Sequence, residues 1–227
     1  LTVAALMVGV AMVIMVRGMT ESFAGDLRIW INAYLGGDVY ITSTVRLRSD
    51  IGRKIQSVDG VYAVTPIRYF DVDWKTPTGE TENINFMAMD VEAYTRVTNF
   101  VFSGEQVDPD LATKQLAMGQ NVFISSVLSE KYDLTVGDSI SLRTRSGYQD
   151  FQVVGIVVDF YNQGLVVQGG WETMQRYFHI KDASTLLVKV EAGQSAEEVQ
   201  KRIDDLYGKR YHLNLISNES IRESVMT

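Results

Sequence analysis

The sequence predicts an α+β fold that is carried on an N-terminal membrane helix. A β-α-β pattern occurs near each end of the body, and the long stretch between the two patterns is mostly β-rich. The chain also opens on an apolar run, residues 1–16, that contains no charge, amide or proline. These three observations separate a lipid-embedded segment from a body of mixed secondary structure.

The opening run, LTVAALMVGVAMVIMV, ends at Arg17. It is shorter than the roughly 20 residues that span a bilayer, but it is already apolar at Leu1. We therefore expect residues 1–19 to be the outer end of a first transmembrane helix that begins upstream. A signal peptide would show small residues before a cleavage site, and a core helix would show a polar stripe. Neither pattern occurs here, so the membrane interpretation is favoured.

Residues 20–37 are predicted to be an amphipathic stalk helix that continues the membrane helix into water. No proline interrupts the segment, and Gly36-Gly37 ends it. A continuous helix over residues 2–35 would be roughly 50 Å long, which exceeds the thickness of the hydrocarbon layer. The residues that we expect to transmit force along this stalk are Phe23, Leu27, Trp30, Ile31, Tyr34 and Leu35.

The first β-α-β unit follows the stalk. Residues 38–44 are β-rich, and apolar residues then recur at helical spacing through residues 46–57. The Asp59-Gly60 pair ends this helix, and residues 61–66 return as a strand.

A second unit near the other end has the same order and a similar size. Residues 184–191 predict a strand, and Ser195 with Glu198 forms a capping box that opens the next helix. The strand 211–216 follows. The residues of this helix that we expect to point inward are Val199, Ile203 and Leu206. Two such units separated by a long stretch predict a split β-α-β sandwich of the ferredoxin-like kind with an insertion.

The insertion is predicted to be mostly β. Its clearest features are two hairpins, and between them lie a short strand and one or two turns of helix. The hairpins are predicted at 70–75 with 82–90 and at 139–145 with 148–159, the strand at 121–125 and the helix at 126–132.

Composition excludes several functions. The chain has 28 acidic and 21 basic side chains, for a net charge of −7, and no basic cluster, which argues against nucleic acid as a partner. It has no cysteine, which excludes disulfides and thiolate chemistry. Motifs for nucleotide binding, serine hydrolysis and zinc-dependent proteolysis do not occur in the sequence. We therefore expect no catalytic residue, no cofactor and no metal site.

Few residues remain as candidates for a site. His179 and His212 lie in unlike contexts, which favours surface or packing roles. Four carboxylates of the first hairpin could hold a cation, although a solvated face is the favoured interpretation: Asp71, Asp73, Glu80 and Glu82. The loop 159–164 and the segment after it mix aromatic and amide groups, and the candidate residues for contact with a partner or substrate are Tyr161, Gln163 and Trp171.

The chain closes on a second membrane approach. Residues 217–220 (SNES) are predicted to cap a new helix, and Ile221 and Val225 begin an inward stripe. We expect residues 218–227 to lead to a second transmembrane helix, which would attach both ends of the body to one membrane face.

Several segments together resemble a known family. They are GGDVYIT, VDGVYAVTP, NVFISSVLSEKYDLTVGDSISL and FQVVGIVVD. In this order they resemble the extracytoplasmic core domain of FtsX-like and MacB-like ABC transporter permeases, a group that includes the lipoprotein-releasing permeases. The resemblance covers Val3 to Thr227 and is most specific over residues 121–159. The chain has Asp59-Gly60-Val61 where the family often has Pro-Gly-Val, which weakens assignment to a subgroup.

The resemblance implies a domain placed between the first two of four membrane spans. It implies a β-α-β "porter" part at residues 38–70 and 183–217 and an inserted "sabre" part at residues 71–182. It also implies partners: a cytoplasmic ATP-binding subunit or domain, a second permease copy or paralogue in a dimer, and an envelope accessory protein or lipoprotein substrate. The implied location is the bacterial inner membrane, with this domain outside the cytoplasm.

The leading hypothesis is a non-catalytic domain that transmits ATP-driven movement across the membrane to export or release a substrate or to act on an envelope partner. The alternative is the ligand-sensing domain of a two-span receptor such as a histidine kinase. A third interpretation, a membrane-tethered enzyme, requires a catalytic cluster that the sequence does not contain. The transported substrate, whether lipoprotein, peptide or drug, is left open.

Overall fold

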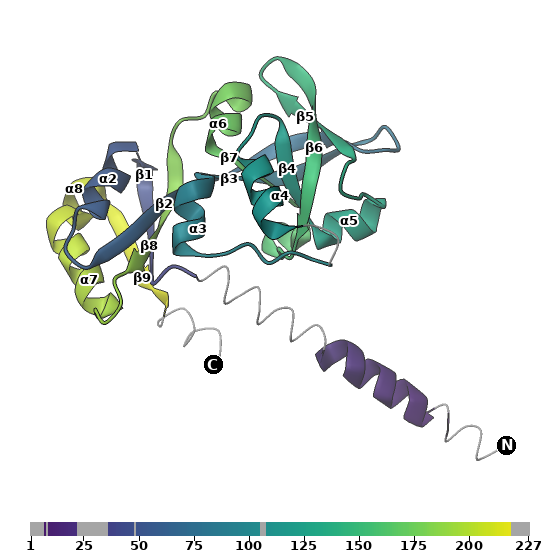
Figure 1. Cartoon of the computed structure of the whole chain (residues 1–227), viewed down its shortest axis with the longest axis horizontal. Helices are drawn as coiled ribbons and strands as arrows, with labels where there is room; N and C mark the ends of the chain where they lie inside the picture. Colours follow the sequence, from purple (N-terminus) through teal and green to yellow (C-terminus); the bar gives the residue numbers. More distant parts are fainter. Residues whose placement is uncertain (1–6, 8, 22–35, 48, 105–107, 219–227) are drawn as a thin grey trace.

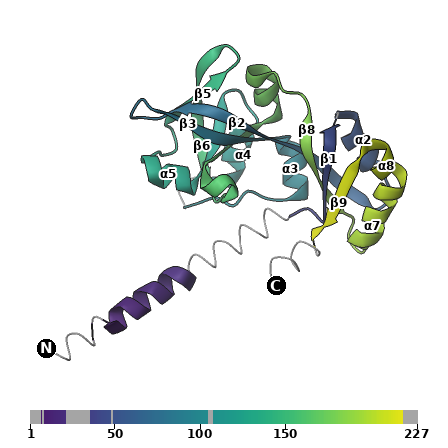
Figure 2. The same cartoon turned by 180° about the vertical axis from the view of Figure 1, so that it is seen from behind.

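The computed structural model describes residues 7, 9–21, 36–47, 49–104 and 108–218, and within them one nine-stranded sheet organises the body (Figures 1 and 2). The strands are β1 (Val39–Leu47), β2 (Val61–Lys75), β3 (Thr81–Met89), β4 (Asn121–Ser125), β5 (Ser139–Thr144), β6 (Gly147–Val157), β7 (Val166–Gly170), β8 (Ala183–Val190) and β9 (Leu213–Ser217). The α-helices are α2 (Ser49–Gln56), α3 (Val91–Val97), α4 (Pro109–Leu116), α5 (Ser126–Tyr132), α6 (Trp171–Thr173), α7 (Ala196–Ile203) and α8 (Lys209–Tyr211). A 3₁₀ turn, η1 (Tyr161–Gly164), and two π turns, η2 (Met174–Phe178) and η3 (Asp204–Gly208), complete the set.

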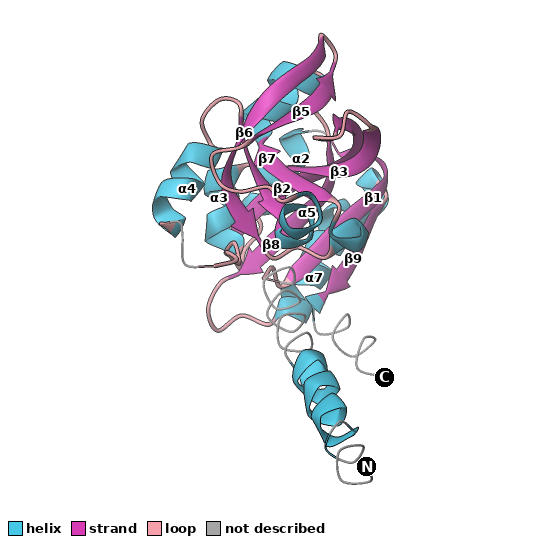
Figure 3. Ribbon diagram, turned by 90° about the vertical axis from the view of Figure 1, so that its right-hand side faces the viewer, coloured by secondary structure: helices cyan, strands magenta, loops and turns pink. Residues whose placement is uncertain are grey.

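One half of the body, the antiparallel half, contains four strands in the order β2-β8-β1-β9. Helix α2 connects β1 to β2, and α7 connects β8 to β9. Both helices present an apolar stripe to the same face of the sheet, where Ile51 and Ile55 of α2 and Val199 and Ile203 of α7 are buried in one cluster. Figure 3 views the body from the opposite half, with α5 in front and the helices around the strands.

The other half, the barrel half, is a ring of six strands in the order β2-β3-β7-β4-β6-β5. The ring closes because Trp74 of β2 pairs with Glu82 in β3 on one side and with Leu142 in β5 on the other. Side chains that alternate inward fill the interior, among them the fully buried Phe86 and Phe151. A closed ring has no free strand edge.

Strand β2 belongs to both halves without a linker. Residues 61–67 pair with β8, and residues 67–75 pair with β3, so the strand passes unbroken through position 70. A third apolar cluster fills the space between the halves. There α3 packs against the second face of the antiparallel sheet, and α4 packs against the outside of the barrel. Because β2 and this shared core join them, the halves form one continuous packed body.

Two helix predictions are wrong in detail. The first helix begins at Ser49 rather than at residue 46, because β1 continues to Leu47 through an irregularity in its register with β8. Leu206 points outward and is 58% exposed. The helix changes from α to π geometry at Asp204, which adds one residue to the turn, so Tyr207 rather than Leu206 packs against the buried cluster.

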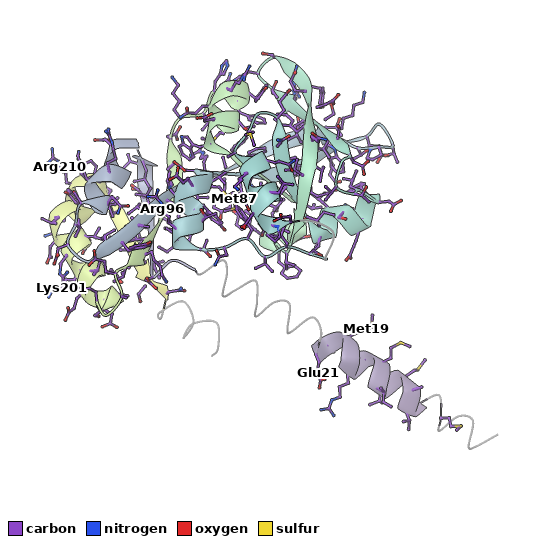
Figure 4. All side chains as sticks on the ribbon, in the orientation of Figure 1. Met19, Glu21, Met87, Arg96, Lys201 and Arg210 are labelled. Carbon is purple, nitrogen blue, oxygen red and sulfur yellow. The ribbon has the colours of Figure 1, made fainter. Side chains whose placement is uncertain are left out.

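The apolar N-terminal run is helical over residues 9–21, and its large side chains are exposed (Figure 4). Arg17 and Glu21 pair across one turn of this helix, with Nε and Oε1 2.9 Å apart. Within the described residues, no helix is both long enough and apolar enough to cross a membrane. The predicted stalk residues lie outside the described residues: Phe23, Leu27, Trp30, Ile31, Tyr34 and Leu35. Residues 219–227 also lie outside them.

Candidate functional site

The chain enters and leaves the body at the same place. Strands β1 and β9 are antiparallel neighbours, and Val39 at the start of β1 is paired with Ser217 at the end of β9. The segments that precede β1 and follow β9 therefore begin side by side at one end of the sheet.

Asp38 fixes the entry point to the neighbouring strand β8. Its carboxylate accepts a hydrogen bond from the backbone N–H of Val190 at 2.8 Å and pairs with the Nζ of Lys189 at 3.2 Å. Its own N–H donates to the carbonyl of Val188 at 2.7 Å. The Lys189 ammonium also donates to the carbonyl of Gly36 at 3.3 Å. Charge-assisted bonds of this kind are stronger than neutral ones.

Asn218 ties the exit point to the entry point. Its backbone N–H donates to the carbonyl of Asp38 at 3.0 Å, and its side-chain Nδ2 donates to the carbonyl of Gly37 at 2.7 Å. Gly37 is packed tightly against β8, since a Cβ at this position would lie 3.2 Å from the carbonyl oxygen of Val188. We call Gly37, Asp38, Lys189 and Asn218 the entry–exit clamp.

Tyr161 and Gln163 lie together in η1, on the barrel half. Asn162, Gln163 and Gly164 have φ values of 48°, 58° and 80°, so three successive residues adopt the left-handed conformation. That conformation costs a non-glycine residue roughly 1–2 kcal/mol. The buried carboxylate of Asp159 helps to hold this turn, because it accepts hydrogen bonds from the N–H of Tyr161 at 2.9 Å and from Gln168 Nε2 at 2.7 Å. Gln163 itself is exposed.

Tyrosine rings gather where this turn meets β2. The rings of Tyr161 and Tyr69 lie 4.7 Å apart between centroids. Burial raises the pKa of the Tyr161 phenol, and the nearby phenol of Tyr40 and the carboxylates of Asp71 and Asp159 add to the increase. These groups make a packed, partly desolvated corner rather than a reactive one.

Trp171 lies apart from that corner, in a cleft of about 410 Å³. The cleft is lined from α2 by Gly52, Arg53 and Gln56, and from the start of α3 by Asp90 and Ala93, with Val64, Pro66, Ala183 and Leu186 at its floor. Tyr161 and Gln163 are not among the lining residues. Thus the structure brings two of the three candidate contact residues together and places the third elsewhere.

Three of the four hairpin carboxylates, those of Asp71, Asp73 and Glu82, are paired with basic or amide groups. Asp73 lies 3.1 Å from Arg143, and Glu82 lies 2.8 Å from Lys131. Asp71 accepts from Asn85 Nδ2 at 3.3 Å. Within the part of the chain that the structure describes, no group of three or more acidic or histidine side chains is arranged to hold a metal ion.

Sequence reasoning missed the clamp and the cleft. Asp38 and Lys189 are ordinary charged residues at strand ends, and their pairing depends on contacts between distant parts of the chain. One usable signal existed: Gly36-Gly37-Asp38 directly before a strand permits a close backbone approach followed by a capping carboxylate.

Comparison with solved structures identifies the fold. The periplasmic region of MacB from Actinobacillus actinomycetemcomitans matches with a TM-score of 0.64 at 13% identity, over 85% of this chain and 95% of that chain. The extracellular domain of the noncanonic ABC-type transporter YknZ from Gram-positive bacteria matches with a TM-score of 0.60 at 14% identity, over 80% and 99% of the two chains. The predicted mixed α/β fold is confirmed, because this chain matches the fold of both domains.

A sequence relative points the same way. An uncharacterized ABC transporter permease protein of Mycobacterium tuberculosis is 22% identical over 238 residues, which cover 100% of this chain and 27% of the relative. The chain thus spans about a quarter of that relative's length. The fold and this relative define the class as the periplasmic domain of an ABC transporter permease. Within this class, the chain belongs to the family of MacB-like periplasmic core domains, whose model matches residues 1–206.

Proposed function

We propose that this chain is a non-catalytic, force-transmitting domain of a permease subunit. ATP hydrolysis in a cytoplasmic subunit or domain would move the membrane helices. The two chain connections would transmit this movement to the folded body, which would change its orientation relative to a substrate or an envelope partner. The entry–exit clamp carries this proposal. It joins both connections to the central strands β1 and β8, so displacement of either connection acts on the whole sheet.

The proposal includes a division of labour between the halves. Residues 38–70 and 183–217 would form the porter part, which would receive the movement of the membrane helices. Residues 71–182 would form the sabre part, which would transmit that movement to a substrate or an envelope partner. The shared strand β2 and the apolar cluster around α3 and α4 support this division, because they couple the parts without a flexible linker.

The membrane and partner assignments belong to the same proposal. Residues 1–19 would be the outer end of a first helix through the inner membrane, residues 20–37 would form the stalk, and residues 218–227 would lead to a second span. A second permease copy or paralogue would complete a dimer, and an accessory protein or lipoprotein would meet the body outside the cytoplasm. The exposed apolar side chains over residues 9–21 support a lipid environment for that segment.

The test is to break the stalk in the complete permease. A Gly-Pro pair inserted after residue 25 interrupts helical hydrogen bonding and should uncouple ATP turnover from transport. The matched control is an Ala-Ala insertion at the same point, which keeps the helix but shifts its phase. Normal transport with the Gly-Pro insertion would refute force transmission through a continuous stalk.

A further inference from the structure

The outer edge of β2 is unpaired in the antiparallel half. Residues 61–67 pair with β8 on one side, whereas the ladder with β3 on the other side begins only at Ile67. Within the described residues, no strand lies beside the outer edge of residues 61–66. Helices α2 and α3 both pack against β2, from opposite faces of the sheet (Figure 1).

The register shows which backbone groups face that edge. Pro66 is paired with Leu186 but has no N–H, so this pair cannot be the hydrogen-bonded type. Pair types alternate along an antiparallel ladder. Thr65 therefore bonds to Leu187, and the N–H and C=O of Val64 point outward. The carbonyl of Tyr62, on the same edge, accepts a hydrogen bond from Gln56 Nε2 at 2.9 Å.

One cleft lies at this edge, and a second hollow lies over the neighbouring end of β8 and residues 191–196. The cleft of about 410 Å³ described above lies at Val64 and Pro66, and the second hollow, of about 470 Å³, includes Tyr62 in its lining. One stripe of α3 borders both hollows, with Asp90 and Ala93 at the first and Arg96 at the second.

The arginine at each hollow differs in whether it already has an ion-pair partner. Arg96, labelled in Figure 4, is already paired with Glu92 on its own helix. Arg53 at the first hollow has no hydrogen-bond or ion-pair partner within the described part of the chain. The carboxylate of Asp90 in the same lining accepts a hydrogen bond from the N–H of Ala93, so Arg53 is the group that could pair with a carboxylate of a ligand.

We propose that this edge binds an extended peptide segment of a separate protein by strand addition to β2. The backbone of the segment would bond to the outward N–H and C=O of Val64. A large apolar side chain would occupy the cleft against Val64, Leu186 and Trp171. An acidic side chain two residues away, on the same face of the added strand, would pair with Arg53. Because Pro66 ends the run of donors, the added ladder is short and the binding reversible. The inference goes beyond the force-transmitting role and does not depend on it.

The experiment uses the 227-residue chain in lipid nanodiscs. The probe is an array of blocked heptapeptides of alternating valine and threonine, in which each aromatic or aliphatic residue in turn is placed two residues from a central glutamate, on the same face of the strand. The expected result is binding by members with a large apolar residue, together with slower hydrogen exchange at the Val64 amide. Methylation of alternate backbone nitrogens of the tightest peptide, which keeps every side chain, should weaken binding by about tenfold because ladder hydrogen bonds are lost.

Two variants test the side-chain part of the proposal. Gly52→Leu should weaken binding by about tenfold, because the new side chain fills the cleft; a Cβ at Gly52 meets only Leu186 Cδ2, at 3.9 Å, so the helix itself is not strained. Arg53→Glu should weaken binding of the glutamate peptides but not of their glutamine counterparts. Lys201→Glu on α7, at the far end of the antiparallel half in Figure 4, is the control for the charge change.

Three results would overturn the proposal. These are absence of binding by every peptide of the array, equal binding of the N-methylated and unmethylated peptides, and unchanged binding by a folded Gly52→Leu variant. Equal binding of the two peptide forms would indicate a purely apolar contact, such as one that a lipid chain could also make. Thermal unfolding of each variant checks that it is folded.

Discussion

Val39 and Ser217 are paired residues of the β1–β9 ladder, although they stand at opposite ends of the body's sequence. The pairing brings the two chain connections together, and the backbone N–H of Asn218, the next residue outward, donates to the carbonyl of Asp38. A load applied at either connection therefore reaches the centre of the antiparallel sheet through hydrogen bonds and one ion pair rather than through a loop.

The clamp should contribute measurably to stability. Asp38→Ala removes the bond to the Val190 amide and the pair with Lys189, and should lower the free energy of unfolding by about 1–2 kcal/mol in urea titration. Asp59→Ala is the control, because Asp59 pairs with Arg202 at 3.2 Å but its side chain is 90% exposed. Equal effects of the two substitutions would contradict a structural role for Asp38.

Thr65→Val should stabilise the protein. The Thr65 side chain is fully buried, and its hydroxyl has no hydrogen-bond partner within the described residues. Replacing an unsatisfied hydroxyl with a methyl group should raise the free energy of unfolding by about 1 kcal/mol. Thr173→Val should do the reverse, because the Thr173 hydroxyl donates to the carbonyl of Gly119 at 2.7 Å. A destabilised Thr65→Val protein would show that the hydroxyl is satisfied in solution.

Gly164 should tolerate no side chain. Its φ is +80°, and a Cβ would lie 2.5 Å from the side chain of Val127. Gly164→Ala combines backbone strain with overpacking and should cost about 3 kcal/mol. Gly193 has a similar φ of +88° but no heavy atom within 4 Å of the added Cβ, so Gly193→Ala should cost only about 1 kcal/mol. If thermal unfolding gave equal losses of stability for the two substitutions, the close contact of Gly164 with Val127 would be contradicted.

The elements predicted best are those set by local chemistry. Strand β4 and helix α5 have the predicted bounds, and the Ser195 hydroxyl accepts from the Glu198 N–H, which is the N-cap half of the predicted capping box. The hairpin of β5 and β6 also occurs where alternation and turn residues placed it.

What could not be predicted depends on distant pairings. Closure of the barrel requires Trp74 to meet Leu142, and nothing local to either residue specifies that partner. The π turn that turns Leu206 outward has no sequence signature beyond a helical pattern that continues through it. For the candidate site, aromatic content drew attention to Trp171, while Arg53 and Asp90 lie in separate elements that only the fold brings together.

High pH should destabilise the body through Tyr94. Burial raises the pKa of this phenol, and the carboxylate of Asp159 and the phenol of Tyr40 add to the increase. The stabilising contribution is complete below the unfolded-state pKa of about 10. Above that pH the unfolded chain releases the proton more readily than the folded one, so stability falls as pH rises. Urea titrations from pH 8 to 11 should show a shallower loss in Tyr94→Phe than in the wild type, and identical slopes would contradict the assignment.

The most direct test of force transmission is movement of the body itself. This chain has no cysteine, so Lys201→Cys gives a single labelling site in this domain. In a complete permease with no other cysteine, the distance between spin labels on the two subunits of the proposed dimer can be measured with and without a non-hydrolysable ATP analogue. The account predicts that ATP binding changes this distance in the wild type. With Asp38→Ala and Asn218→Ala combined, the change should be lost while ATP turnover continues. A distance change equal to the wild type's in the folded double variant would contradict the account.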